Sequence, residues 1–243
     1  MSLTRPIIGY GQYLKHIIKY GRFAPHPRRV IHVDPANIKY QLHPKIKEKN
    51  GISKYKKHVL NGDWDKATPV NDDWYFPSEQ KKESQIKLRL DRYILYKSIR
   101  RHFEDDIPWE NTRWYQYVIN NPGTVGGEYD SRESMENQLS KVDNMYQAIR
   151  QDGYKSQREL GDIGFLPEYD EVTVHIGREG ELYKAPGGRH RLILAKLLDI
   201  KRIPVNVHVR HELWQKKRIQ ARENHKNLSA KTQENHPDLE INK

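Results

Sequence analysis

A glycine pair followed by three cationic residues stands at the start of an apolar helical pattern. Gly187 and Gly188 precede Arg189, His190 and Arg191. Glycine lets the backbone approach a ligand closely, and the first turn of a helix offers free N–H groups and the positive end of the helix dipole. The cationic side chains add charge-assisted donors at the same place. The pattern predicts a phosphate-binding turn; the alternative is a plain strand-to-helix turn with solvated basic side chains.

A second candidate for chemistry is the turn formed by residues 62–65. Asp63 and Asp65 flank Trp64 there. Two carboxylates at this spacing offer the oxygen ligands that Mg²⁺ prefers. The sequence favours the other interpretation, an Asx turn anchored by a buried tryptophan ring.

Histidines of the C-terminal half raise the question of a metal centre. His175 and His208 lie on predicted strands, and His211 would continue the second of them. Successive side chains of a strand point to opposite faces, so His208 and His211, three positions apart, diverge. We therefore predict no zinc site from these residues.

The composition restricts the class of protein. The chain has 243 residues, 35% of them hydrophobic, and no cysteine. This excludes disulfides, thiolate metal sites and cysteine nucleophiles. No apolar run reaches the ~20 residues that span a bilayer, and no signal-peptide core is evident, so we expect a cytoplasmic protein.

Positive charge is concentrated at the N-terminus. Residues 1–62 carry 13 Lys/Arg and 2 Asp/Glu, a net charge of +11, whereas residues 63–243 carry 30 of each and are neutral. Residues 1–62 are thus the expected contact with nucleic acid or an anionic membrane surface. Within them, the Lys- and Tyr-rich residues 39–58 are expected to be solvated and partly irregular, with single-strand binding as the alternative.

Hydrophobic spacing predicts the elements of the first half of the chain. Residues 7–20 and 85–103 have apolar groups at helical spacing, residues 111–117 form a short aromatic-rich helix, and residues 30–33 form a strand. We expect a basic, mainly helical, aromatic-rich N-terminal region over residues 1–121.

The second half predicts a compact α+β unit at residues 122–211. Asn and Gly residues at 120–127 indicate a linker, and a helix ends at Asp152-Gly153. The elements that follow are, in order, a half-buried strand at 172–176, a turn and return strand at 177–184, a helix reaching residue 198 and an alternating strand at 205–209. Residues 212–243 are expected to form a short helix at 214–222 and then a disordered or extended tail from about 224.

Four stretches together resemble the ParB/sulfiredoxin superfamily. They are Ile149 to Gly153, Val172 to Ile176, the box from Gly187 to Leu192, and Ile203-Pro204-Val205. The similarity covers about residues 128–210. It implies an α+β fold in which a small mixed sheet is packed with helices.

The box is most similar to those of sulfiredoxins and free-serine kinases. Arg189 stands where sulfiredoxins have their cysteine, which excludes that reductase chemistry. About 33 residues follow Arg210, fewer than the DNA-reading and dimer domains of ParB clamps need. The resemblance therefore implies a nucleotide- or phosphate-binding protein, as a kinase-like phosphotransferase or nucleotide hydrolase that uses ATP, ADP or CTP with Mg²⁺. The alternative is a ParB-like DNA-binding protein or nuclease that holds phosphates with residues 1–62.

The resemblance also implies roles for individual side chains. Glu128, with Glu133 as a rival, would be a general base or a Mg²⁺ ligand, and His190 would donate to a phosphate or orient it. Arg132 and Arg178 would supply a second anion contact. The alternatives are a solvated loop carboxylate, a helix-capping histidine and ordinary surface arginines.

Overall fold

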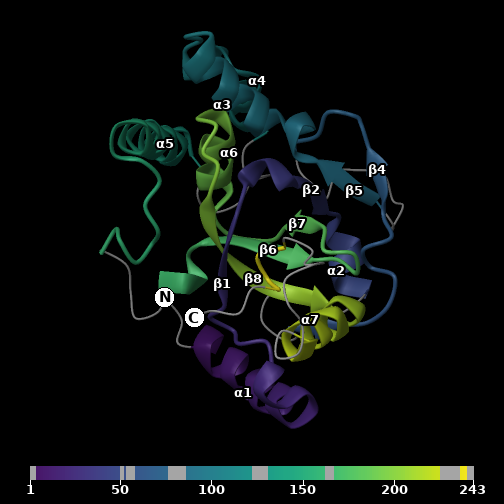
Figure 1. The fold of residues 1–243 in the computed structure, drawn as a ribbon. Helices are drawn as coiled ribbons and strands as arrows, with labels where there is room; N and C mark the ends of the chain where they lie inside the picture. The colour runs from purple at the N-terminus through teal and green to yellow at the C-terminus, as the bar shows by residue number, and fades with distance from the viewer. Residues whose placement is uncertain are drawn as a thin grey trace.

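One mixed sheet joins strands from both halves of the chain (Figure 1). The structure is a computed structural model that describes residues 4–49, 52, 58–75, 86–121, 131–161, 167–224 and 236–239. Its strands are β1 (Val30–Val33), β2 (Ile38–Leu42), β3 (Val59–Leu60), β4 (Thr68–Val70), β5 (Ile86–Arg89), β6 (Val172–Ile176), β7 (Leu182–Lys184) and β8 (Ile203–His211). Their order is β1-β8-β6-β7-β2-β5-β4, and β3 also pairs with β8.

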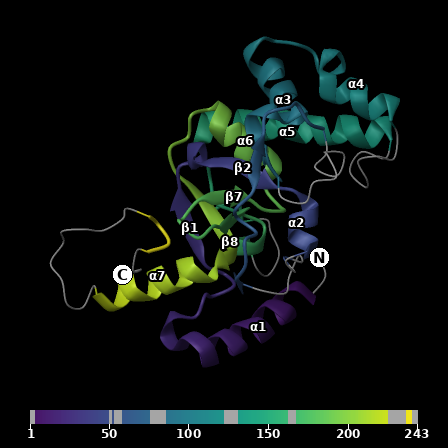
Figure 2. The ribbon, with the colours of Figure 1, turned by 90° about the vertical axis from the view of Figure 1, so that its right-hand side faces the viewer.

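The helices gather at two ends of this sheet. Both ribbon views place α3, α4, α5 and α6 at one end and α1 and α7 at the other (Figures 1 and 2). The α-helices of the described ranges are α1 (Thr4–Tyr20), α2 (Pro44–Lys49), α3 (Ile94–Glu104), α4 (Arg113–Asn120), α5 (Arg132–Asp152), α6 (Arg189–Leu197) and α7 (Glu212–Asn224). Of the helices in the described ranges, none has both the length and the hydropathy required to cross a membrane.

The expected α+β character is confirmed, and the second half follows its predicted order. α5 ends at Gly153, whose φ of 80° lies in the left-handed region that favours glycine. β6 and β7 form the predicted antiparallel hairpin, and α6 and β8 follow. The strand at 172–176 was expected to be half-buried, but all five of its residues are buried, because β6 lies in the middle of the sheet between β8 and β7.

The helical N-terminal region also supplies strands to the shared sheet. β1 pairs with β8, and β2 pairs in parallel with β7. The sheet therefore spans the predicted boundary near residue 122, and that boundary itself lies outside the described residues.

Three local predictions are corrected. The single helix expected at 85–103 is a strand, β5, followed by α3; Ile86 and Leu88 alternate with polar residues and pair with β2. Residues 38–42 and 44–49 are regular as β2 and α2, with Leu42 and Ile46 fully buried in a cluster around Trp64. Finally, residues 236–239 of the expected disordered tail dock on the core, where Asp238 is fully buried.

Candidate anion-binding pocket

The turn between β7 and α6 has the left-handed backbone that only glycine adopts readily. Gly187 and Gly188 have φ of 104° and 65°. Gly188 also lies directly against β6, since a Cβ placed on it would come within 2.7 Å of the Val172 Cα atom. Close packing on the sheet therefore requires this glycine, in addition to any approach of a ligand.

Substitution of Gly188 by alanine is expected to lower the free energy of unfolding. The new Cβ would collide with backbone atoms of Val172, which cannot rotate away, and would strain a positive φ. We expect a loss of about 2–4 kcal/mol, measured by chemical denaturation. Gly153→Ala is the matched control, because Gly153 also has a positive φ but has nothing within 4 Å of its Cβ position. Equal losses in the two variants would contradict the packing argument.

The glycine turn forms one wall of a cavity of about 700 Å³. This volume suits a nucleotide-sized molecule. The cationic or ionisable basic side chains along its wall come from α2, β3, β7, α6 and β8 and the residues beside them: Lys47, His58, Lys184, Arg189, His190, Arg191 and His208. Asp170 is the one carboxylate among the described residues that line it.

Lys184 supports the glycine turn from within the fold. Its side chain is buried, and its Nζ donates to the carbonyl oxygens of Ala185 and Gly187. Burial lowers the pKa of Lys184 well below its ordinary value, and the charges of Arg189 and Lys47 lower it further. The lysine both holds the shape of the turn and brings a basic group beneath it.

Two further basic groups are weakened in the same way. Burial, with the nearby charge of Arg189, lowers the pKa of Lys47 to about 8 and that of His190 to about 4. His190 is therefore neutral at pH 7, able to accept or donate a hydrogen bond without carrying charge. A bound anion would favour the charged forms of Lys47 and Arg189, because it would offset the repulsion between them.

Arg189 lies at the exposed side of the pocket. Its Nη1 donates to the Tyr93 hydroxyl at 2.9 Å, and its guanidinium lies 5.6 Å from the centre of that ring. The remaining N–H groups of the guanidinium make no hydrogen bond that fixes them within the described residues. Tyr93 thus orients a cation that is solvent-accessible at the first residue of α6.

Arg191 borders the pocket but is engaged in the fold. Its Nη1 lies 3.3 Å from Glu171 Oε2, its Nη2 donates to the Lys155 carbonyl, and its guanidinium lies 4.5 Å from the centre of the Tyr154 ring. Both charged side chains are nearly inaccessible to solvent. Arg191 therefore anchors α6 to the segment that follows α5, and its contact with a phosphate stays a prediction.

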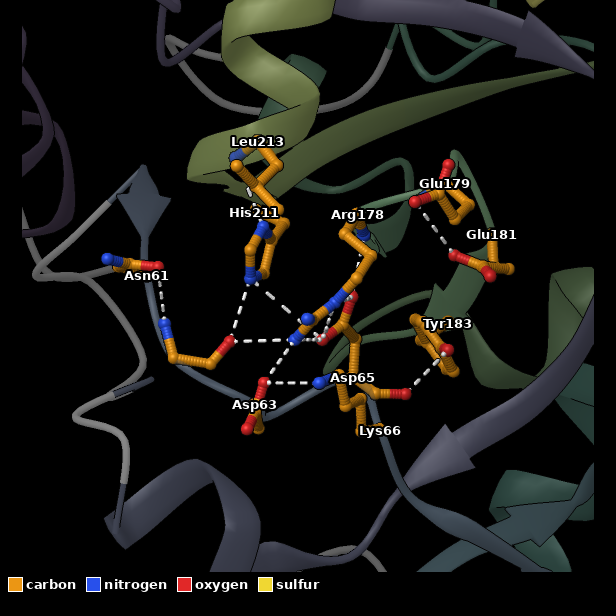
Figure 3. Close-up of polar contacts among 11 residues, drawn as sticks. Asn61, Asp63, Asp65, Lys66, Arg178, Glu179, Glu181, Tyr183, His211 and Leu213 are labelled. Carbon is orange, nitrogen blue, oxygen red and sulfur yellow. Dashed lines mark hydrogen bonds and ion pairs between the residues drawn. The ribbon is translucent and has the colours of Figure 1, made fainter.

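Arg178 lies in a different cluster, on the turn between β6 and β7 (Figure 3). Its guanidinium donates to Asp65 at 2.7 Å, to Asp63 at 2.8 Å and to the Gly62 carbonyl at 3.0 Å. It does not line the pocket. This position gives no support to the prediction that Arg178 makes a second anion contact in the pocket, because Asp63 and Asp65 already pair with it.

The same cluster explains the turn at residues 62–65. Trp64 is fully buried, which agrees with the prediction of a turn anchored by its tryptophan ring. Asp65 accepts hydrogen bonds from the backbone N–H and the side chain of Arg178. His211 Nδ1 accepts from the Leu213 N–H, so its Nε2 carries the proton and donates to the Gly62 carbonyl at 2.7 Å (Figure 3). The carboxylates therefore serve an ion-pair network that joins this turn to the turn between β6 and β7, while the His211 hydrogen bond joins it to the end of β8.

The remaining predicted site residues lie apart from the pocket or outside the described ranges. Arg132 is exposed at the start of α5 and does not line the cavity, and Glu128 lies outside the described residues. His208 borders the pocket with its ring centre 5.3 Å from that of His175, whereas His211 belongs to the cluster of Arg178. No group of three metal-ligating side chains occurs in the portions of the chain that the structure describes.

Sequence reasoning missed Lys47, Lys184 and Asp170 as pocket residues. Lys47 is separated from the glycine turn by about 140 positions, so no local spacing connects them. Lys184 offered a signal, since it ends the hairpin strand just before the turn.

The fold and the pocket together define a mixed α/β protein with a strongly basic cavity at a helix N-terminus. Comparison of the chain with protein-family models, curated proteins and solved structures finds no match. The resemblance to the ParB/sulfiredoxin superfamily accordingly stays a prediction.

Proposed function

We propose that this protein binds a phosphate-bearing ligand, a nucleotide such as ATP, ADP or CTP, in the pocket at the start of α6. One observation carries the proposal: basic side chains from separate parts of the chain converge on the glycine turn, where burial, with a smaller contribution from the charge of Arg189, lowers the pKa of Lys47, Lys184 and His190. Burying basic groups beside the Arg189 cation is unfavourable for their charged forms, and a bound anion would offset that cost. Functional pockets are where such perturbed groups gather.

The proposed contacts follow from the positions of the side chains. The first N–H groups of α6 and the Arg189 guanidinium would hold the phosphates. Lys47, from α2 in the N-terminal half of the chain, would add positive charge. Neutral His190 would donate or accept a single hydrogen bond. Lys184 would hold the turn in its binding shape.

Phosphoryl transfer or nucleotide hydrolysis is the chemistry proposed for this site. It requires a group that orients the acceptor hydroxyl or water, and Asp170 is the described carboxylate that borders the cavity. One carboxylate suits Mg²⁺ only if phosphate oxygens and waters complete its shell, as is usual for this ion. Glu128 stays the alternative base.

Nucleic-acid binding by residues 1–62 is the less favoured function. Part of that charge is neutralised within the fold, since Arg28 pairs with Glu168 at 2.7 Å and Lys19 pairs with Glu212 at 2.9 Å. Lys47 lines the pocket. Steeply salt-dependent binding to nonspecific duplex DNA would support this alternative.

Binding is tested by thermal denaturation with ATP, ADP, CTP and GTP, each with and without Mg²⁺. A ligand at 100 times its Kd that binds only the folded protein adds about 2.7 kcal/mol to the free energy of unfolding. For a chain of this size the melting temperature should rise by roughly 5–11 °C. No shift with any nucleotide would contradict the proposal.

The variants separate binding from folding and from chemistry. Arg189→Ala should raise Kd by about tenfold or more, since a hydrogen bond to a charged group contributes about 1.5–3 kcal/mol. Arg202→Ala, which removes an exposed arginine outside this pocket, should leave Kd unchanged. Asp170→Asn should retain binding but lose phosphate release or transfer; unchanged turnover would exclude Asp170 as the orienting group.

A further inference from the structure

One face of α1 is held against the rest of the protein by ring contacts. The Tyr13 and His26 ring centres lie 4.8 Å apart, and those of His16 and His58 lie 6.1 Å apart. Tyr13 and His16 are three residues apart and so share one side of the helix. This side defines the inner face of α1.

An adjoining side of the helix presents apolar side chains to solvent. Leu14 is 64% exposed, Ile17 40% and Ile18 87%. Among the described side chains, the other large exposed hydrophobic residues are Leu160 and Leu213, whereas these three lie together within two turns of one helix. Single exposed apolar residues are normal in a protein surface, but a group on one helix face indicates an interaction site.

Basic side chains border this apolar face. Lys15 is exposed beside Leu14, and Arg22 is exposed just after the helix. Lys19 remains 59% exposed although it pairs with Glu212. The ribbon views place α1 at the outer edge of the molecule, with its outer side away from the sheet (Figures 1 and 2). The face is therefore apolar at its centre, positive at its border and open to a large flat partner.

We propose that this face of α1 docks on an anionic phospholipid surface. The apolar side chains of Leu14, Ile17 and Ile18 would enter the boundary of the acyl region, and Lys15 and Arg22 would contact lipid phosphates. Charge selects this occupant: Lys15 and Arg22 would repel the same residues of a second copy, and exposed leucine and isoleucine do not suit the phosphates of a nucleic acid. The proposal is independent of the nucleotide pocket.

The test is co-sedimentation of the full chain with sucrose-loaded vesicles. Vesicles of phosphatidylcholine alone are compared with vesicles in which a third of the lipid is phosphatidylglycerol. Contact of Lys15 and Arg22 with anionic lipid predicts about 30-fold stronger partitioning to the anionic vesicles than to the neutral ones. High salt should reduce this difference. Equal partitioning to both vesicles, or to neither, would overturn the proposal.

Variants on the exposed face should act without disturbing the fold. The double variant Leu14→Gln and Ile18→Gln should reduce partitioning by about tenfold or more, because it removes apolar area that would be buried in the lipid on binding. Leu160→Gln replaces another exposed leucine, 48% accessible and away from α1, and should bind like the unaltered protein. Unaltered vesicle binding in the double variant overturns the proposal. So does a dimer in analytical ultracentrifugation that the double variant dissociates, if vesicles do not bind, since the partner is then a second copy.

Discussion

Replacement of Asp238 by alanine is expected to lower the free energy of unfolding by about 3–5 kcal/mol, the cost of removing one partner of a buried ion pair. Asp238 accepts from Arg210 at 2.7 and 2.8 Å and from the Trp214 indole at 3.0 Å. Arg218 Nε lies 3.7 Å from its carboxylate. All three charged side chains are buried, so the variant would leave two cations without their counter-charge.

The pH dependence of stability should report the same carboxylate. Burial by itself would raise the pKa of Asp238, but Arg210 and Arg218 outweigh it and hold the pKa well below the ordinary value. A depressed pKa in the folded state contributes stability above the unfolded pKa of about 3.9, and this contribution is lost as the pH falls toward the folded value. The unaltered protein should therefore lose stability below about pH 4 more steeply than Asp238→Ala.

Chemical denaturation at pH 7 and between pH 2 and 5 measures both effects. Thermal denaturation at pH 7 should show a decrease in melting temperature of roughly 6–20 °C for a chain of this length. Asp199→Asn is the matched control: its pair with Lys201 is exposed, and such pairs contribute about 0–1 kcal/mol. A loss in Asp238→Ala no larger than that of the control would show that residues 236–239 do not anchor this end of the protein.

Replacement of Glu171 by alanine is expected to lower the free energy of unfolding by about 3 kcal/mol. The change would leave the buried Arg191 guanidinium without its carboxylate and remove the acceptor of the Gln157 N–H, which lies 2.6 Å from Glu171. Because Arg191 is in the first turn of α6, the variant should also disturb the glycine turn. Nucleotide affinity should fall together with stability.

Glu171→Gln distinguishes charge from hydrogen bonding at this position. Burial raises the pKa of Glu171, with partial opposition from the Gln157 N–H and Arg191. The ionised form is therefore costly to bury, and a neutral side chain that still accepts a hydrogen bond should lose only about 1 kcal/mol. Denaturation of both variants, with the exposed Glu223→Ala as control, measures the difference. A glutamine variant as unstable as the alanine variant would mean that the charge itself is required.

The elements with regular hydrophobic spacing could be predicted, and those defined by pairing could not. α5 and its glycine end, the hairpin of β6 and β7, and β8 follow from local patterns. β2 has little local signal, because it is stabilised by its neighbours β5 and β7 and by the burial of Leu42. The tail from about residue 224 has no hydrophobic periodicity. Its docking depends on the ion pairs of Asp238 with the buried Arg210 and Arg218, which local sequence patterns do not reveal.

The candidate site divides in the same way. Amino-acid sequence alone determined the glycine turn and the start of α6, because glycine tolerance of positive φ and the helix pattern are properties of adjacent residues. Only the tertiary structure decided which cations share the pocket: it brought Lys47 to the turn, committed Arg191 to Glu171 and placed Arg178 with Asp65. The physical reason is that the electrostatic partner of a charged side chain depends on distance in space, which the sheet sets by pairing strands remote in the chain.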